Sequence, residues 1–113
     1  MNSFQTNNKS EVKIMTYPFT RTLTEGNTGQ DVYRLQYALN AVGRYYLISS
    51  CNCKADGIFG PETKNALMSF QAWDNITVDG IFGNISSDHL VKRYNAGPVA
   101  VWGEKPLDQV FQS

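Results

Sequence analysis

Apolar residues recur at helical spacing after Gly29, on one stripe of positions i, i+3, i+7 and i+10. The residues on this stripe are Val32, Leu35, Leu39 and Val42. Such a stripe predicts an amphipathic helix that turns this face to the core. Thr28 followed by Asp31 predicts a capping box at the start of this helix. Gly43 is placed to take the left-handed conformation at its end.

Two further helices are predicted, from about Pro61 to Trp73 and from about Asn84 to Tyr94. Their expected inward positions are Thr63, Ala66, Leu67 and Phe70 in the former and Ile85, Leu90 and Tyr94 in the latter. Phe70 is the expected centre of the core. The run Ala96-Gly97-Pro98 is expected to end the last helix, because proline cannot continue the backbone ladder.

The pentapeptide Asp-Gly-Ile-Phe-Gly occurs twice, at Asp56–Gly60 and at Asp79–Gly83, 23 residues apart. An Asp-Gly pair favours a tight turn, because glycine accepts positive φ and aspartate can accept backbone N–H groups ahead of it. The closing glycine stands where a helix N-cap is expected, and Pro61 suits the first helical position. The repeat therefore predicts a duplicated turn and helix within one small domain.

The whole chain of 113 residues has room for one domain with tails. We expect a polar tail and short extended arm over residues 1–16, a helical domain over residues 17–95, and a C-terminal tail over residues 96–113. Ten basic residues balance ten acidic ones, which argues against nucleic acid as a partner. No apolar run approaches the roughly 20 residues that a membrane span requires, so no membrane partner is expected.

The N-terminal residues contain no apolar stretch typical of a signal peptide. The expectation from this is synthesis in the cytoplasm.

The cysteines, Cys51 and Cys53, stand one residue apart, so a disulfide between them would close a small, strained ring. Free thiols are the expected state. A structural zinc site requires about four ligands, and His89 is the only histidine. We therefore expect neither a metal nor a cofactor.

Three blocks of sequence resemble the peptidoglycan-binding domain found beside many bacterial and phage cell-wall hydrolases. The blocks are Arg21–Leu39, with spaced glycines, Asp-Val and Leu-Gln; Asp56–Gln71, with Asp-Gly-x-Phe-Gly-x-x-Thr and a closing Phe-Gln; and Val78–Gly83, with Val-Asp-Gly-Ile-x-Gly. The resemblance implies an all-α fold, a compact three-helix bundle, and non-covalent binding of peptidoglycan as a targeting module for a lytic enzyme. It also implies a site of action at the cell wall or outside the cell, which the protein would reach by release through phage lysis. The stretch from Tyr45 to Lys54 is longer than the usual family loop, and Ser86 replaces a more common threonine.

An enzymatic function is not expected from these residues. Any nucleophile with a histidine base would have to use His89, and nothing around it suggests a nucleophile elbow. Asp56 and Asp79 could form a carboxylate pair for glycoside cleavage. Each lies in an Asp-Gly turn, however, where accepting backbone N–H groups is the simpler role.

Binding requires only aromatic faces and hydrogen-bonding groups in a shallow groove. The candidate peptidoglycan-contacting residues are Tyr33, Tyr37, Asp56, Phe59, Thr63, Trp73, Asp79 and Phe82. A structural role competes with each of these, and Phe59 and Phe82 are expected in the core.

The alternative is a bundle co-opted as a protein interaction module, such as a phage adaptor, an inhibitor or a virion component. Its surfaces would be Tyr45 and Tyr46 in the long loop and Trp102 in the tail. A cell-wall hydrolase or another protein is the partner that this alternative predicts.

Overall fold

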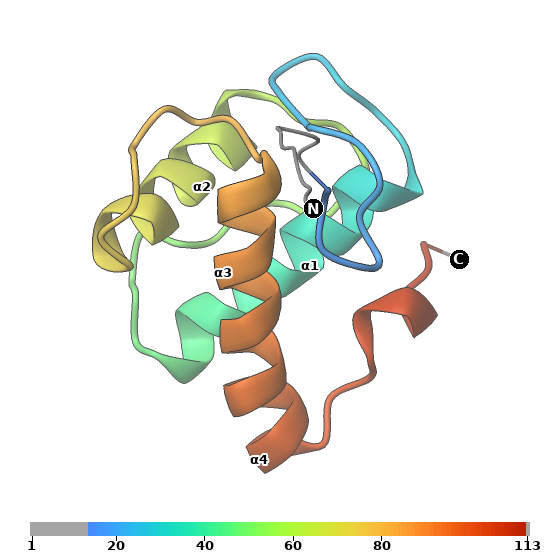
Figure 1. Ribbon diagram of the computed structural model, residues 1–113, viewed down its shortest axis with the longest axis vertical. Coiled ribbons are helices and arrows are strands. Elements are labelled where there is room, and N and C mark those ends of the chain that lie inside the picture. The colour runs from blue at the N-terminus through green and yellow to red at the C-terminus, as the bar shows by residue number, and fades with distance from the viewer. Residues whose placement is uncertain (1–13, 113) are drawn as a thin grey trace, which may run out of the picture.

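The computed structural model describes residues 14–112, in which the regular elements are helices. They are α1 (Gln30–Tyr45), α2 (Pro61–Trp73), α3 (Asn84–Tyr94), a π-helical turn (Asn95–Val99), α4 (Ala100–Trp102) and a 3-10 turn (Leu107–Gln109). In Figure 1, α3 and α4 form one long column, and α1 crosses behind α3. The expected all-α three-helix bundle is confirmed, as are the bounds of α2 and α3.

The core lies between these helices and the two Asp-Gly-Ile-Phe-Gly turns. The side chains of Leu35, Leu67, Phe70 and Leu90 have no exposed surface. Ile85, an expected core residue, is instead 57% exposed. The reason is the register of α3, whose first turn directs Ser86 and Ser87 inward and leaves Ile85 outside.

The start of α1 differs from the expected capping box. Gly29 is the N-cap, and no side chain caps the helix. Thr28 pairs with Ile58 in an isolated antiparallel bridge, so its backbone belongs to a turn contact rather than to the helix. Asp31 binds Arg21 at 2.7 Å. The hydrogen bond from the Arg21 guanidinium lowers the pKa of the Asp31 carboxyl. By contrast, Gly60 and Gly83 are the N-caps of α2 and α3, as expected.

Gly43 lies within α1 and not at a left-handed end. A Cβ atom at this position would lie 2.2 Å from the Cys51 carbonyl oxygen. Gly43 is therefore required by the close approach of the loop that follows α1. The positive φ beyond the helix falls on Leu47, at 60°.

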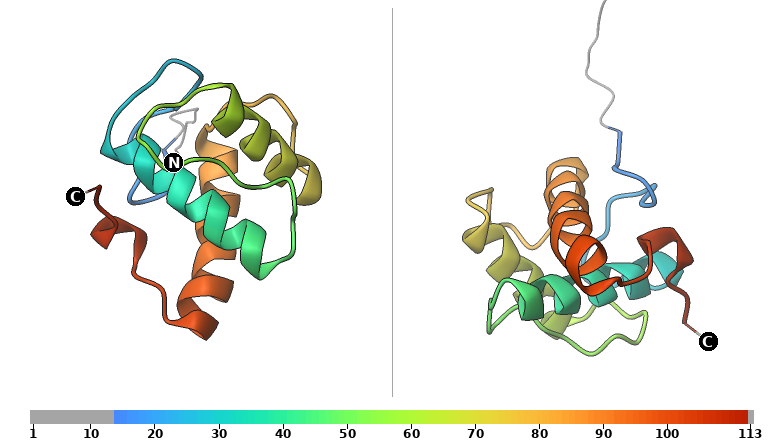
Figure 2. Two further views of the ribbon diagram at one scale, coloured as in Figure 1. Left: turned by 180° about the vertical axis from the view of Figure 1, so that it is seen from behind. Right: turned by 90° about the horizontal axis from the view of Figure 1, so that it is seen from below.

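α3 ends at Tyr94, but helical backbone continues through Ala96-Gly97-Pro98, where the sequence predicts that it stops. The π-helical turn carries Pro98 and leads directly into α4, which ends at the left-handed Gly103 with φ 72°. Residues 103–112 then return beside the first half of α1, as both views in Figure 2 show. Leu107 and Val110 are buried there, and Arg34 donates to the Val110 carbonyl at 3.2 Å. The predicted domain limits at residues 17 and 95 stay a prediction.

The segment before α1 also packs on the bundle. Thr16 donates its backbone N–H to Ser87, and Phe19, after a cis Tyr17–Pro18 bond, places its ring 4.7 Å from that of Phe82. The extended arm expected over residues 1–16 lies mostly outside the described residues.

Substitution of Phe70 by alanine tests the core. Its ring is fully buried, so Phe70→Ala is expected to lower the free energy of unfolding by about 3–5 kcal/mol. Urea denaturation followed by circular dichroism measures this change. The control is Val78→Ala, at a side chain that is 46% exposed, with an expected loss below about 1 kcal/mol. Equal losses in the two variants would contradict the position of the core.

The two cysteines are free and buried, and Cys51 donates its thiol to the Leu39 carbonyl oxygen. Burial raises the pKa of Cys51 to about 12 and that of Cys53 to about 11. Alkylation requires an accessible thiolate, so both the pKa and the burial oppose it at neutral pH.

Iodoacetamide at pH 8 is therefore expected to label the native protein roughly a hundredfold more slowly than the protein in denaturant. Mass spectrometry follows the labelling. Equal rates in the two conditions would show that the loop after α1 opens readily.

Candidate functional site

A buried glutamine on α2 organises the second Asp-Gly-Ile-Phe-Gly turn. The Gln71 side chain is completely buried. Its Oε1 accepts the backbone N–H groups of Asp79 at 3.1 Å and Gly80 at 3.0 Å. Its Nε2 donates to three acceptors at about the same distance, namely Asp79 Oδ1 at 2.9 Å, the Ile81 carbonyl at 3.1 Å and Ser86 Oγ at 3.0 Å. One amide thus joins α2, the turn and the start of α3.

A second glutamine, Gln36 of α1, holds the first turn in the same way. Its Oε1 accepts from the backbone N–H groups of Asp56 and Gly57, at 3.0 and 2.8 Å. Its Nε2 donates to Asp56 Oδ1, the Ile58 carbonyl and Thr63 Oγ1. The two halves of the domain therefore share one hydrogen-bond pattern, with Thr63 in the place of Ser86.

The aspartates of both turns hold backbone groups. Asp56 Oδ1 accepts the Ile58 N–H, and Asp79 Oδ1 accepts the Ile81 N–H, each at 3.0 Å. The hydrogen bond from Ile58 lowers the pKa of the Asp56 carboxyl. The expectation that these carboxylates satisfy the backbone is confirmed.

The segment before α1 pairs with both turns. Leu23 and Phe82 exchange two backbone hydrogen bonds, of 3.0 and 2.9 Å, and Phe59 bonds to Gly26 and Asn27. These pairs direct the Phe59 and Phe82 rings into the core, where they are 1% and 0% exposed. Thr63 is 2% exposed. The inclusion of these three side chains among the ligand contacts is therefore corrected, because they offer no surface to a ligand.

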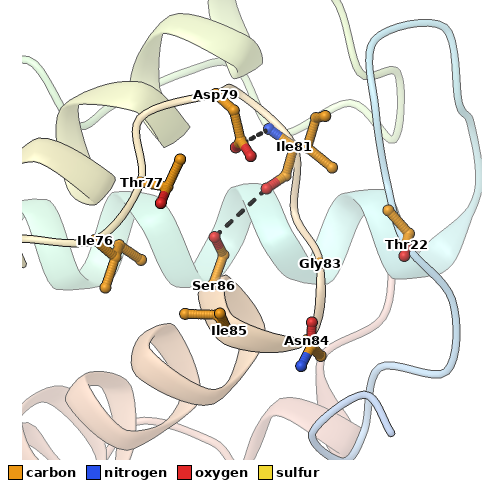
Figure 3. Close-up of a pocket in the computed structure, with 9 residues that line it drawn as sticks. All are labelled: Thr22, Ile76, Thr77, Asp79, Ile81, Gly83, Asn84, Ile85 and Ser86. Carbon is orange, nitrogen blue, oxygen red and sulfur yellow. Dashed lines mark hydrogen bonds between the residues drawn. The ribbon is translucent and has the colours of Figure 1, made fainter. Parts of the chain in front are cut away.

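The second turn forms one wall of a surface pocket of about 360 Å³, shown in Figure 3. Ile81 and Ile85 supply exposed apolar surface, 42% and 57% exposed. The other lining residues are Thr22, Ile76, Thr77, Asp79, Gly83, Asn84 and Ser86. Of the eight candidate residues from the sequence, Asp79 alone lines this pocket.

The α1 tyrosines do not line this pocket, and Tyr37 lies against Tyr94 and Glu104. Tyr37 donates its hydroxyl to Glu104, and its ring lies 6.4 Å from that of Tyr94. The hydrogen bond to Glu104, with burial, raises the pKa of Tyr37 to about 12. Tyr33, 6.5 Å from Tyr37 between ring centroids, also packs on the core. Both tyrosines thus partly cover the core.

Trp73 lies in a third place, at the end of α2. Its ring centroid is 5.1 Å from that of Tyr46, and the Arg93 guanidinium lies 4.8 Å over it. The structure therefore separates the candidate residues into the turns, the α1 tyrosines and the end of α2.

His89 is bound to a buried carboxylate. Its Nδ1 lies 2.9 Å from Asp74, whose other oxygen accepts two hydrogen bonds from Arg93. Among residues 14–112, no group of three His, Cys, Asp or Glu side chains is close enough to hold a metal ion. Within that same range, no helix has the length and apolar character needed to cross a bilayer.

The sequence reading missed the role of Gln36 and Gln71. The two turns are 23 residues apart, whereas the glutamines are 35 apart, so superposing the repeats does not align them. The sequence signal for a buried glutamine was the pairs Leu35-Gln36 and Phe70-Gln71, in which a polar residue directly follows a core residue. Thr22 and Asn84 were also missed, because only the folded backbone brings them to the pocket.

Comparison with known proteins finds a matching family model and a similar solved structure. The family model described as "Putative peptidoglycan binding domain" matches residues 28–85, about half of the chain. The crystal structure of the SleB N-terminal domain is similar, with a TM-score of 0.57 and 35% identity over 66% of this chain and 93% of that domain.

Two enzymes are similar over part of their length. The spore cortex-lytic enzyme of Oceanobacillus iheyensis is 37% identical over 81 residues, 71% of this chain and 27% of that enzyme. The zinc D-Ala-D-Ala carboxypeptidase of Streptomyces albus G is 37% identical over 67 residues, 59% of this chain and 25% of that enzyme. The chain spans about a quarter of the length of these relatives.

Replacing one glutamine tests the shared hydrogen-bond pattern. Gln71→Leu keeps the volume but leaves the N–H groups of Asp79 and Gly80 without their acceptor, so an unfolding free energy lower by about 2–4 kcal/mol is expected. Gln36→Leu is the matched variant and should lose a similar amount. Thermal and urea unfolding measure both. A loss below about 0.5 kcal/mol in both variants would refute the role of the amides.

Proposed function

Because the chain belongs to the peptidoglycan-binding domain family, we propose that it binds bacterial peptidoglycan without cleaving it and acts as a cell-wall targeting module. The observation that carries this proposal is the family match over residues 28–85, which includes both turns and both glutamines. The likeness to a spore cortex-lytic enzyme supports action at the cell wall. In this proposal the module is phage- or prophage-encoded and acts with a separate cell-wall hydrolase.

The pocket at the second turn is the proposed contact site. Its two exposed isoleucines suit the apolar faces of sugars or the methyl groups of stem-peptide alanines. Thr22, Thr77 and Asn84 supply hydrogen-bonding groups around them. One shallow site of this kind binds weakly, and a polymer with many copies of the ligand raises the effective affinity.

The first turn is a poorer candidate because the C-terminal segment lies on it. Gln112 donates its side-chain N–H to the Asp56 carbonyl at 3.2 Å and its backbone N–H to Gln30. A Cβ atom on Gly57 would lie 3.0 Å from Gln112 Oε1. In the second turn, a Cβ atom on Gly80, the equivalent of Gly57, would lie 2.8 Å from the Lys64 side chain. Asp79 and Ile81 of that turn nevertheless line the open pocket.

The non-catalytic part of the proposal rests on how the polar groups are used. The aspartates of both turns accept backbone N–H groups, and His89 is paired with Asp74. The other candidate is a protein interaction module. Trp102 favours it, because a large aromatic residue that is 49% exposed is a common contact in protein interfaces.

Co-sedimentation with purified, protein-stripped sacculi tests the function. The wild-type protein is expected in the pellet, and Ile81→Ala should weaken binding about three- to tenfold because it removes exposed apolar contact area from the pocket. Ile58→Ala is the matched control, since Ile58 has the equivalent place in the first turn and is 56% exposed. It should bind as the wild type does.

Recovery of the wild-type protein in the supernatant, over several peptidoglycan chemistries and at low salt, would exclude peptidoglycan binding. Equal losses in the two isoleucine variants would place the site elsewhere than the second turn.

A further inference from the structure

Four aromatic rings form a continuous row across the ends of three helices. Trp73 ends α2, Tyr46 and Tyr45 stand at the end of α1, and Trp102 ends α4. The centroid distance is 5.1 Å from Trp73 to Tyr46, 4.9 Å from Tyr46 to Tyr45 and 4.9 Å from Tyr45 to Trp102. Figure 1 shows the end of α1 and α4 in the same lower part of the molecule.

The row is partly open to solvent. Trp73 is 38% exposed and Trp102 49% exposed, while Tyr45 and Tyr46 are half-buried. The Tyr45–Trp102 pair meets edge to face at 73°. An edge-to-face contact uses one face of one ring only, so part of the aromatic surface stays available to a ligand.

Backbone contacts at Gly97 and Arg93 position two rings of the row. A Cβ atom on Gly97 would lie 2.6 Å from the Tyr45 ring, so only glycine admits that ring here. Gly97 lies in the π-helical turn between α3 and α4, and π-helical turns are frequent at functional sites. Tyr46 is fixed from its other end, where its hydroxyl donates to the Arg93 carbonyl at 3.1 Å.

Polar side chains of α3 connect the row to the pocket. Ile85 lines the pocket, and His89 and Arg93 follow on the same helix face at i+4 and i+8. Asp74 accepts hydrogen bonds from both His89 and Arg93, and Arg93 covers one face of Trp73. The exposed face of α3 therefore leads from the second turn to the aromatic row.

We propose that the aromatic row binds the glycan strand of peptidoglycan as an extension of the pocket, an inference that rests on the proposed function. Sugar rings present apolar C–H faces that pack on aromatic rings, and their hydroxyl groups bond to polar side chains at the edge. A strand that covers both places makes more contacts than a single disaccharide.

The row extends past the residues that the family model matches. Trp102 lies outside residues 28–85, where the family model matches. Tyr45, Tyr46 and Trp73 lie inside that range, so Trp102 alone carries the row beyond it. The row therefore gives this protein a preference for long strands that the matched region does not by itself contain.

The test compares two probes by isothermal titration calorimetry, namely long peptide-free glycan strands and the single disaccharide. Trp102→Ala should weaken the binding of long strands about five- to tenfold and leave disaccharide binding unchanged. Phe111→Ala is the matched control, since Phe111 is 60% exposed and lies over Arg34 outside the row. Thermal unfolding checks that each variant folds, which is expected because both side chains are exposed.

Unchanged binding of long strands by Trp102→Ala would overturn the inference while the proposed function stands, provided that Ile81→Ala still weakens sacculus binding. Failure of the wild-type protein to bind sacculi would remove the proposed function itself. If Trp102→Ala loses binding to untreated cell walls but not to protein-stripped sacculi, the row contacts a protein, which also overturns the inference.

Discussion

The bundle depends on two amides buried among apolar side chains. Gln36 and Gln71 are fully buried, and a buried amide without partners would cost several kcal/mol. Each finds its partners in the turn that precedes the next helix and in the first residues of that helix. Gln36 of α1 positions α2, and Gln71 of α2 positions α3. Packing of each helix and formation of the following turn are therefore coupled. The glutamine amide needs the turn for its hydrogen bonds, and the backbone N–H groups of the turn need the amide.

The two turns share one hydrogen-bond pattern but differ in how far they are exposed to solvent. The segment before α1 bonds to both turns and fixes their phenylalanines in the core. Residues 103–112 then pack along α1 and reach the first turn through Gln112. The second turn borders an open pocket with Ile81 at its edge. The C-terminal segment thus contacts the first turn and leaves the pocket at the second turn open. The proposed binding site is therefore at the second turn.

The proposed binding surface lies on a rigid framework. The pocket and the aromatic row are held by helix ends, by the buried Asp74 and by backbone hydrogen bonds, so little ordering entropy is lost when a ligand binds. Shallow contacts of this kind suit a repetitive polymer, on which a weakly bound module can engage many identical sites.

The sequence by itself determined the features that depend on neighbours along the chain. These are the three helices, the two turns, the glycine N-caps and the backbone role of Asp56 and Asp79, because each follows from local φ/ψ preferences, helical periodicity and short-range hydrogen bonds. The order and spacing of the motifs also determined the family.

Tertiary structure decided whatever depends on residues far apart in sequence. Gly43 admits the Cys51 carbonyl, Thr28 pairs with Ile58, and Tyr37 meets Glu104. No periodicity encodes these contacts. The candidate site was therefore predicted in part only. Asp79 was predicted and lines the pocket. Thr22 lines it because of the path of the N-terminal segment, and Asn84 and Ile85 line it because of the register of α3. A local pattern fixes which elements form, and the packing between them decides which side chains remain exposed to bind.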